Sequence, residues 1–291
     1  MFKIKLKEPS TLTDKDHIKS FFYSDELKLQ CRLNTWNENG VNKIPLYVWL
    51  GDKIISSRLK KEQKILDIGC GTGLLLKYII NRPNNIVYGI DISSKMVEVT
   101  RKKLPKKMKK NVHIGDIEKL PFPDNFFDHV IASHVLQHVS NIKKALQEMK
   151  RVAKFGGKIW ITTSDLKLNK GLNAIHYFAL QKNKFPNYML NKKQYLRFTP
   201  KIAVDLFHKL YSKTTILKYK NDCILKTKEV CLNYYHSAMM YRNSYGPTDQ
   251  RIDEKKWDKQ ILEVEKQIDK KLRKNKKIIM PGTVIALCGI K

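Results

Sequence analysis

The sequence predicts an α/β fold in which helices cover both faces of a doubly wound, mostly parallel sheet. Three observations predict it: an apolar run leads into a glycine-rich turn at 69–73, an apolar helical stretch follows at 74–80, and strand-like and helix-like segments then alternate up to residue 164. Such alternation is typical of strand–helix–strand units, whose strands run parallel. The chain has 291 residues, enough for one large domain or for a core with a cap.

The first strand and the glycine turn are typical of a nucleotide-binding unit. Glycines are needed at 69–73 because the turn is tight and a ligand must approach the backbone without a Cβ in the way. Asp67 precedes the first glycine by two residues, and no Lys-Ser/Thr pair follows as it does in a P-loop. A carboxylate there would repel a pyrophosphate, so we expect a ligand with an ammonium group or hydroxyl groups.

Acids also end the next two strands. The second strand, expected over 86–90, ends at Asp91, where an acid can accept hydrogen bonds from ribose hydroxyls. The third strand, expected over 112–115, ends at Asp116. Three strands that end in acids beside one glycine turn predict a site for a nucleoside with a cationic tail.

The remaining elements follow from periodicity and from turn residues. We expect strands at 127–132, 157–162, 214–219 and 283–288, and helices at 141–152, 171–181, 200–210, 228–241 and 255–274. The glycines of 155–157 predict a turn between the helix at 141–152 and the fifth strand, since glycine accepts positive φ.

Four segments, in the same order and at similar spacing, resemble the successive motifs of class I S-adenosylmethionine-dependent methyltransferases of the small-molecule type. They are residues 66–73, 89–93, 115–122 and 127–131, and the resemblance covers roughly residues 60–165. It implies a seven-stranded, doubly wound sheet whose last strand is antiparallel, with helical cap insertions. It also implies S-adenosyl-L-methionine as the cofactor and no metal ion.

The resemblance assigns roles near the glycine turn. Gly69, Gly71 and Gly73 pass under the cofactor, and Asp67 orients its methionine ammonium group, directly or through water. Asp91 takes the ribose hydroxyls.

Further roles fall on the loops after the next strands. Ile92 and Met96 flank the adenine, and Asp116 accepts from its amino group, with Ile117 beside it. Ala132 or Ser133, just past the fourth strand, offers its backbone to the methionine part.

One more contact is expected ahead of the core. Residues 31–35 loosely resemble an arginine-containing stretch that precedes the core in some relatives. In that case Arg32 pairs with the methionine carboxylate.

The chain divides into four expected parts: an N-terminal helical cap or lid at 1–60, the cofactor-binding core at 61–164, a cap insertion at 165–213, and the closing strands of the core with helical insertions at 214–291. The first part has helical patterns at 24–33 and 41–59 and is rich in aromatic residues. Aromatic residues there either pack the cap on the core or close a lid over cofactor and substrate, and both can hold.

Methyl transfer from a sulfonium is a single displacement, so the protein supplies position, desolvation and sometimes a base. His134 and His138 follow the fourth strand and are candidate bases, although side chains there also serve packing. Asp165, just past the fifth strand, is placed to hold a cationic amine or to take a proton. Its alternative role is to cap the helix that follows.

The formal net charge of +30 points to a polyanionic partner, yet only 9 of the 57 basic residues are arginine, the residue that binds phosphates bidentately. The lysines are also spread along the chain. We therefore favour a methyltransferase for a small molecule or a small peptide-like metabolite. The alternatives are an RNA or tRNA methyltransferase and a non-catalytic, cofactor-binding regulator.

No run of about 18 apolar residues is present, so no membrane span is expected. The five cysteines form no CxxC pair and no metal-ligand spacing. Their odd number and scatter favour reduced thiols and a cytoplasmic location. The sequence leaves open whether the protein is a monomer or a homodimer.

Overall fold

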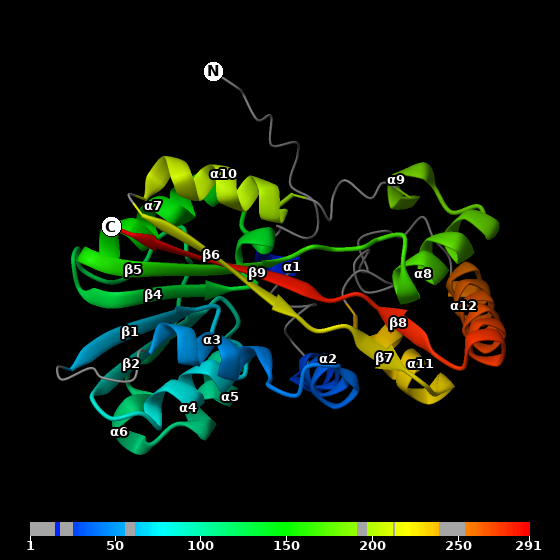
Figure 1. Ribbon diagram of the computed structural model, residues 1–291, viewed down its shortest axis with the longest axis horizontal. Coiled ribbons are helices and arrows are strands. Elements are labelled where there is room, and N and C mark those ends of the chain that lie inside the picture. Colours follow the sequence, from blue (N-terminus) through cyan, green and yellow to red (C-terminus); the bar gives the residue numbers. More distant parts are fainter. Residues whose placement is uncertain (1–14, 18–25, 56–61, 191–196, 212, 239–253) are drawn as a thin grey trace.

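The computed structural model describes residues 15–17, 26–55, 62–190, 197–211, 213–238 and 254–291. Figure 1 shows a twisted sheet with helices on both faces and, to its right, a smaller group of helices. A short helix, α1 (Lys15–His17), precedes both.

The main sheet has seven strands in the order β3-β2-β1-β4-β5-β9-β6. They are β1 (Gln63–Ile68), β2 (Asn85–Asp91), β3 (Val112–Ile114), β4 (Phe127–Ser133), β5 (Ala153–Ser164), β6 (Thr214–Lys220) and β9 (Thr283–Ile290). Neighbours from β3 to β5 are parallel, whereas β9 is antiparallel to both β5 and β6. The predicted seven-stranded, mostly parallel sheet with an antiparallel last strand is confirmed.

Helices cover both faces of this sheet (Figure 1). One face carries α3 (Leu46–Ile54), α4 (Leu74–Ile80), α5 (Ser94–Lys103) and α6 (Lys106–Lys109), and the other carries α7 (Ile142–Val152) and α10 (Pro200–Leu210). Successive side chains of a strand point to opposite faces. Leu66 and Ile68 accordingly join the hydrophobic cluster of α7 and α10, whereas Ile65 joins that of α3 and α4.

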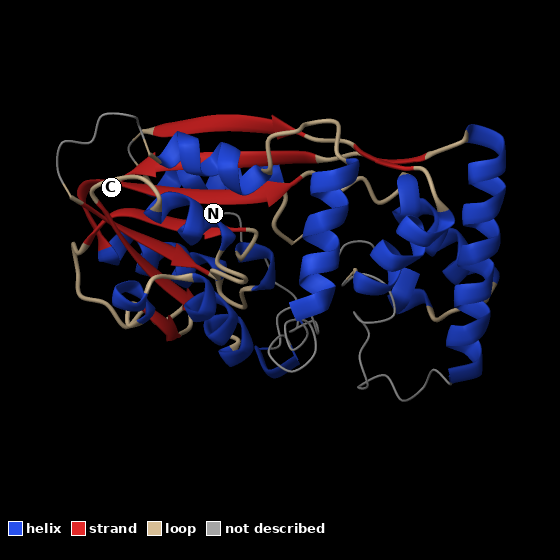
Figure 2. Cartoon of the chain, turned by 90° about the horizontal axis from the view of Figure 1, so that it is seen from below, coloured by secondary structure: helices blue, strands red, loops and turns tan. Residues whose placement is uncertain are grey.

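A second body, which we call the helical lobe, is built on an extension of the sheet. Beyond β6 and before β9, the chain forms β7 (Cys223–Leu225) and β8 (Ile278–Met280), which pair in a separate two-stranded sheet. Around it lie α2 (Glu26–Asn39), α8 (Gly171–Lys182), α9 (Asn187–Leu190), α11 (Lys228–Ser237) and α12 (Glu254–Asn275) (Figures 1 and 2). Leu172, Tyr235 and Ile268 are buried together at its centre, so the lobe has a hydrophobic core of its own.

Several boundaries differ from the prediction. The helix expected over 41–59 is α3, which starts at Leu46 because Pro45 occupies its N-cap position; residues 56–59 lie outside the described residues. The expected turn at 155–157 is instead an irregular part of β5, where Gly156 adopts φ 74° and the register with β4 shifts. β7 and β8 were not predicted, since three-residue strands carry too little periodicity.

The segment expected as a cap insertion, 165–213, contributes to both bodies. α8 packs in the helical lobe, whereas α10 lies on the main sheet with Ala203 and Phe207 fully buried. Within the described residues, no helix combines the length and the apolar character needed to cross a membrane.

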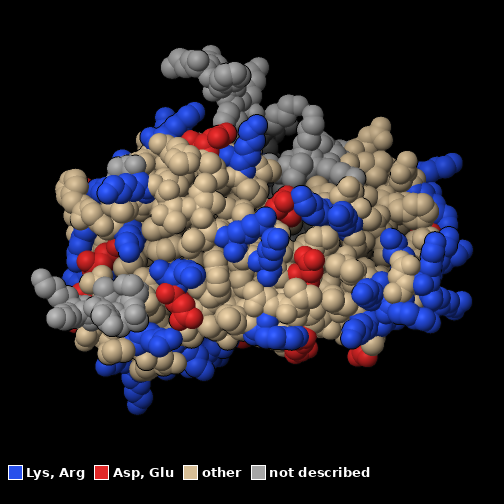
Figure 3. Space-filling model, viewed as in Figure 1, with Lys and Arg blue, Asp and Glu red and all other residues tan. Residues whose placement is uncertain are grey.

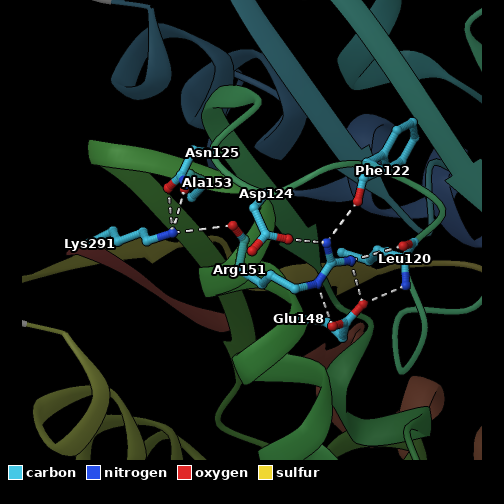
Figure 4. Close-up of polar contacts among 8 residues, drawn as sticks. All are labelled: Leu120, Phe122, Asp124, Asn125, Glu148, Arg151, Ala153 and Lys291. Atoms are coloured by element: carbon cyan, nitrogen blue, oxygen red, sulfur yellow. Dashed lines mark hydrogen bonds and ion pairs between the residues drawn. The ribbon is translucent and has the colours of Figure 1, made fainter.

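The edge of the sheet where β4 and β5 begin is closed by Arg151 at the end of α7 (Figure 4). Its guanidinium pairs with Glu148 at 2.7 Å and with Asp124 at 2.7 Å. It also donates to the carbonyls of Leu120 (3.0 Å) and Phe122 (2.8 Å). One side chain thereby ties the loop before β4 to α7.

Lys291 extends this closure to β9 (Figure 4). Its Nζ donates to Asn125 Oδ1 at 2.8 Å and to the carbonyls of Ala153 (2.9 Å) and Arg151 (3.2 Å). Because these contacts occupy the amino-terminal ends of β4 and β5, the opposite edge is the one left open for a ligand.

Replacing Arg151 by alanine should lower the free energy of unfolding by about 2–3 kcal/mol, because the loop carbonyls and Glu148 lose charge-assisted hydrogen bonds. Urea unfolding should show a lower midpoint with an unchanged slope. Arg82→Ala is the matched control, since Arg82 is half exposed and pairs only on the surface, 3.2 Å from Asp52. It should cost much less than Arg151→Ala, because solvent screens an exposed ion pair. Equal losses in the two variants would contradict a special role for Arg151.

Candidate functional site

The glycine turn after β1 has the backbone shape that the sequence predicts. Gly69, Gly71 and Gly73 adopt φ values of 66°, 54° and 73°, in the left-handed region that favours glycine. At Gly69 a Cβ would lie 2.4 Å from Cγ2 of Val135, so no side chain fits. At Gly71 a Cβ would lie at an ordinary contact distance, 3.7 Å from Cδ2 of Leu29, so this less tightly packed part of the turn lines the cavity.

Two side chains hold this turn in place. Thr100, fully buried in α5, donates from Oγ1 to the Gly71 carbonyl at 2.8 Å. The Gly71 N–H donates to Asp91 Oδ2 at 2.9 Å, and the N–H of Ser93 donates to Oδ1 at 2.9 Å. The carboxylate of Asp91 is thus fixed against the turn, with acceptor capacity left for a ligand.

Asp67 and Asp91 are both buried, at 3% and 7% exposure, at the ends of adjacent strands β1 and β2. Burial, together with the charge of Asp91, raises the pKa of Asp67 to about 8. Burial also raises the pKa of Asp91, although its backbone hydrogen bonds oppose the shift. Such a pair favours a ligand that brings positive charge or hydroxyl donors.

The turn opens into a cavity of about 630 Å³, a usual size for a small-molecule site. One wall is the carboxyl edge of the sheet, made by the loops after β1 to β5. The other wall comes from α3 and from the helical lobe, where α2, Tyr234 and Ala238 contribute to it. Cδ2 of Leu29, on α2, lies over the cavity side of Gly71, so α2 covers the turn.

At the β2–β3 side, Ile92, Asp116 and Ile117 line the cavity, as their predicted roles require. Met96 is fully buried in α5 and is not one of the described residues that line the cavity. Lys15 of α1 forms an ion pair with Asp116 at this end. Neither Lys15 nor Thr100 was singled out from the sequence, because neither belongs to a recognisable motif.

The turn after β4 brings Ser133, His134 and His138 to the cavity. His134 adopts φ 57°, and its N–H donates to Thr162 Oγ1 at 3.0 Å, so the turn is tightly held. His134 has an open face toward the cavity, yet desolvation by the surrounding protein lowers its pKa to about 4. The imidazole is therefore neutral at pH 7 and is only a weak base.

Past β5, Asp165 also lines the cavity, with its side chain 42% exposed. It pairs with Lys167 at 2.7 Å, and its N–H donates to the Thr283 carbonyl at 2.9 Å. Asp165 does not cap α8, which begins at Gly171. Its carboxylate is thus available to the cavity but is partly neutralised by a neighbour.

Two arginines complete the cavity wall. Arg32 of α2 donates from Nη1 to the Ser237 carbonyl, while its buried Nη2 has no hydrogen-bond partner. Arg197, just before α10, has a buried Nη1 that likewise lacks a partner. Arg197 was not predicted from the sequence. The sequence feature that could have singled it out is the scarcity of arginine in this lysine-rich chain.

These residues suit a cofactor that has an ammonium group, ribose hydroxyls, an adenine and a carboxylate. The acid pair fits the ammonium group and the hydroxyls, and the cavity side of Gly71 admits a ligand against the backbone. The unpartnered Nη2 of Arg32 fits a carboxylate. Among the described residues, no cluster of three His, Cys, Asp or Glu side chains is placed to hold a metal ion.

Comparison with known families identifies the domain that contains this site. Residues 66–161 match the family model described as a methyltransferase domain. The chain carries a class I methyltransferase domain, whose cofactor is S-adenosylmethionine. The matched region runs from β1 to β5 and so contains the glycine turn and all three cofactor-side acids.

Relatives and solved structures agree with this methyltransferase domain. A demethylmenaquinone methyltransferase of Geobacillus is 30% identical over 171 residues, which span 57% of this chain and 64% of the relative. The YcgJ protein of Bacillus subtilis has a TM-score of 0.53 at 20% identity, over 83% of this chain and 97% of that one. Phosphoethanolamine N-methyltransferase 2 of Haemonchus contortus has a TM-score of 0.55 at 16% identity, over 95% of this chain and 59% of that one. The chain spans less than two thirds of the length of the curated relatives it matches first.

Binding of S-adenosylhomocysteine, which retains the ammonium group, should release about one proton at pH 7. With a pKa near 8, Asp67 is largely protonated in the free protein, and a cation beside it lowers that pKa. Calorimetric titrations in two buffers of different ionisation enthalpy measure the released proton. In Asp67→Asn the release should vanish, and no buffer dependence in the wild type would show that the pair is already ionised.

The same raised pKa fixes how the stability of the free protein depends on pH. The folded state keeps a proton on Asp67 that the unfolded chain loses above its ordinary pKa of 3.8. The resulting stabilisation is complete below that pH and is lost as pH rises through about 8.

Proposed function

We propose that the protein transfers the methyl group of S-adenosylmethionine to a small molecule or a small peptide-like metabolite. The observation that carries this proposal is the single cavity of about 630 Å³, which starts at the acid pair and continues past the cofactor motifs to the end of β5. Its walls come from both bodies of the molecule, which leaves room for a small acceptor beside the cofactor.

In this proposal the acids hold and orient the cofactor. Asp67 lies near the ammonium group, Asp91 accepts from the ribose, and Asp116 accepts from the adenine after exchanging its bond with Lys15. Arg32 pairs with the carboxylate. When bound, the cofactor supplies a methyl group that is already activated.

The protein's remaining contribution is placement and the exclusion of water. Ser133 and His134, at the rigid turn after β4, face the cavity between the glycine turn and the end of β5. We propose that they position the acceptor, and that Asp165 contacts it or takes its proton. A neutral His134 adds no further positive charge beside the sulfonium.

The charge distribution supports a small acceptor rather than RNA. Figure 3 shows lysines and arginines scattered over the visible face, with acids among them. The arginines of the cavity, Arg32 and Arg197, have buried nitrogens that a nucleic acid on the surface would not reach. All five cysteines are unpaired, which supports the proposal of a reducing, cytoplasmic location.

Asp91→Ala should weaken binding of S-adenosylmethionine at least tenfold, or about 1.4 kcal/mol, because the ribose loses its acceptor. Calorimetry measures the change. Asp52→Ala, an exposed carboxylate 2.6 Å from the Tyr78 hydroxyl, is the matched control and should bind normally.

Cofactor labelled in its methyl group tests the activity itself. Incubation with a low-molecular-weight metabolite fraction should label a small molecule, and Asp91→Ala should label far less. Label that appears only in added RNA would replace this proposal with the RNA alternative. Tight cofactor binding without label in either pool would favour the non-catalytic regulator.

We further propose that α2 is the lid over the cofactor, because Leu29 covers Gly71 and an ion pair of 3.6 Å joins Glu26 to Lys103 of α5. Addition of S-adenosylhomocysteine should then slow amide hydrogen exchange in α2. The outer helix α12 provides the internal control and should exchange at an unchanged rate. If the exchange rate in α2 is the same with and without the ligand, this helix only packs on the core.

A further inference from the structure

Arg197 occupies an unusual position for a charged side chain. Its Nη1 is buried in the cavity wall with no hydrogen-bond partner, and within the described part of the chain no carboxylate forms an ion pair with it. A guanidinium stays protonated in proteins, so its charge is held there uncompensated. A guanidinium nitrogen that is buried without a partner has lost its hydration, and an anionic ligand would replace the lost interaction.

The backbone directly after Arg197 is anchored to the main sheet and to α10. The next residue, Phe198, is buried in the core of the main sheet, and its carbonyl accepts from Thr163 Oγ1 at 2.7 Å. Thr199 then caps α10 by accepting from the Ile202 N–H at 3.4 Å. These contacts hold Arg197 beside the end of β5, in the wall of the cavity that Asp165 also lines.

Two arginines with unpartnered nitrogens face one cavity, whereas the cofactor has a single carboxylate. Arg32 is the better partner for it, because Arg32 lies three residues after Leu29 on α2, and residues at that spacing share one helix face. Leu29 lies over Gly71, so Arg32 is close to the turn that receives the methionine part. Arg197 is then left for a different anion.

The substrate side of the cavity also carries an excess of positive charge. Asp165 is already paired with Lys167 at 2.7 Å. Lys170 lines the same part of the wall, and no carboxylate of the described residues forms an ion pair with its ammonium group. An anionic group on the second ligand would balance these charges.

We infer that Arg197 binds an oxyanion, a carboxylate or a phosphate, on the methyl-accepting substrate. The planar guanidinium offers two parallel N–H donors that match either group bidentately. The inference rests on the proposed function and narrows it to acceptors that carry an anionic group.

The test uses full-length protein saturated with S-adenosylhomocysteine, titrated in separate arms with inorganic phosphate and with acetate. Wild type should bind at least one of the two anions, and the stronger arm indicates the class of oxyanion. Arg197→Gln should weaken that binding at least tenfold. Arg197→Lys should keep part of it, because lysine retains the positive charge but lacks the two parallel N–H donors of the guanidinium. Arg82→Gln, a surface arginine outside the cavity, should behave as wild type. Affinity for S-adenosylhomocysteine should change less than twofold in all variants.

Two results would overturn the inference. Anion binding that is unchanged in Arg197→Gln, or absent from the wild type, would show that Arg197 is no oxyanion site. A tenfold loss of S-adenosylhomocysteine affinity in both Arg197 variants would instead assign Arg197 to the cofactor carboxylate. Failure of wild type to bind S-adenosylhomocysteine at all defeats the proposed function, so the two failures are distinct. Circular dichroism of Arg197→Lys and Arg197→Gln verifies that both are folded.

Discussion

Two carboxylates buried side by side at the ends of β1 and β2 constrain the whole site. Asp67 and Asp91 are less than one tenth exposed, so desolvation and mutual repulsion make it costly to ionise both of them in the free site. The cost is tolerated because the backbone partly compensates it: the N–H groups of Gly71 and Ser93 donate to Asp91. The glycine turn has its shape because one of those donors must point back at the acid while the other side of the turn stays open to a ligand.

The two edges of the sheet differ accordingly: one is closed by hydrogen bonds, and the other lines the cavity. At the amino-terminal edge, Arg151 and Lys291 join the loop before β4 to α7, β5 and β9 with hydrogen bonds to backbone carbonyls. At the carboxyl edge the strands end in acids and in the strained turn of His134, and the helical lobe stands across from them. The lobe is carried by the β7–β8 extension of the sheet, so the two walls of the cavity are parts of one continuous structure (Figure 2).

The cofactor side is readable from the sequence because its residues are local. Asp67, the glycines and Asp91 lie at fixed distances from strand ends, and parallel strands bring such ends together without further information. The helical lobe is different. α2, α8, α11 and α12 come from segments far apart in the chain, and only tertiary packing brings them to one core. The role of Arg197 could not be predicted from the sequence for the same reason. Its position depends on the hydrogen bond between Thr163 and the Phe198 carbonyl, which joins β5 to a segment 35 residues away.

The distribution of charge inside the cavity links the two sides. Acids gather at the cofactor end, where Asp67, Asp91 and Asp116 lie, and cations gather past β5, where Arg197 and Lys170 lie. A cofactor with an ammonium and a sulfonium complements the first group, and an anionic acceptor complements the second. Each ligand then lowers the cost of burying the charges of its own wall, and the opposite charges of the two ligands attract across the cavity. An acceptor drawn toward a sulfonium by its own anionic group reaches the methyl group in a restricted set of orientations, which is what a displacement reaction requires of its protein.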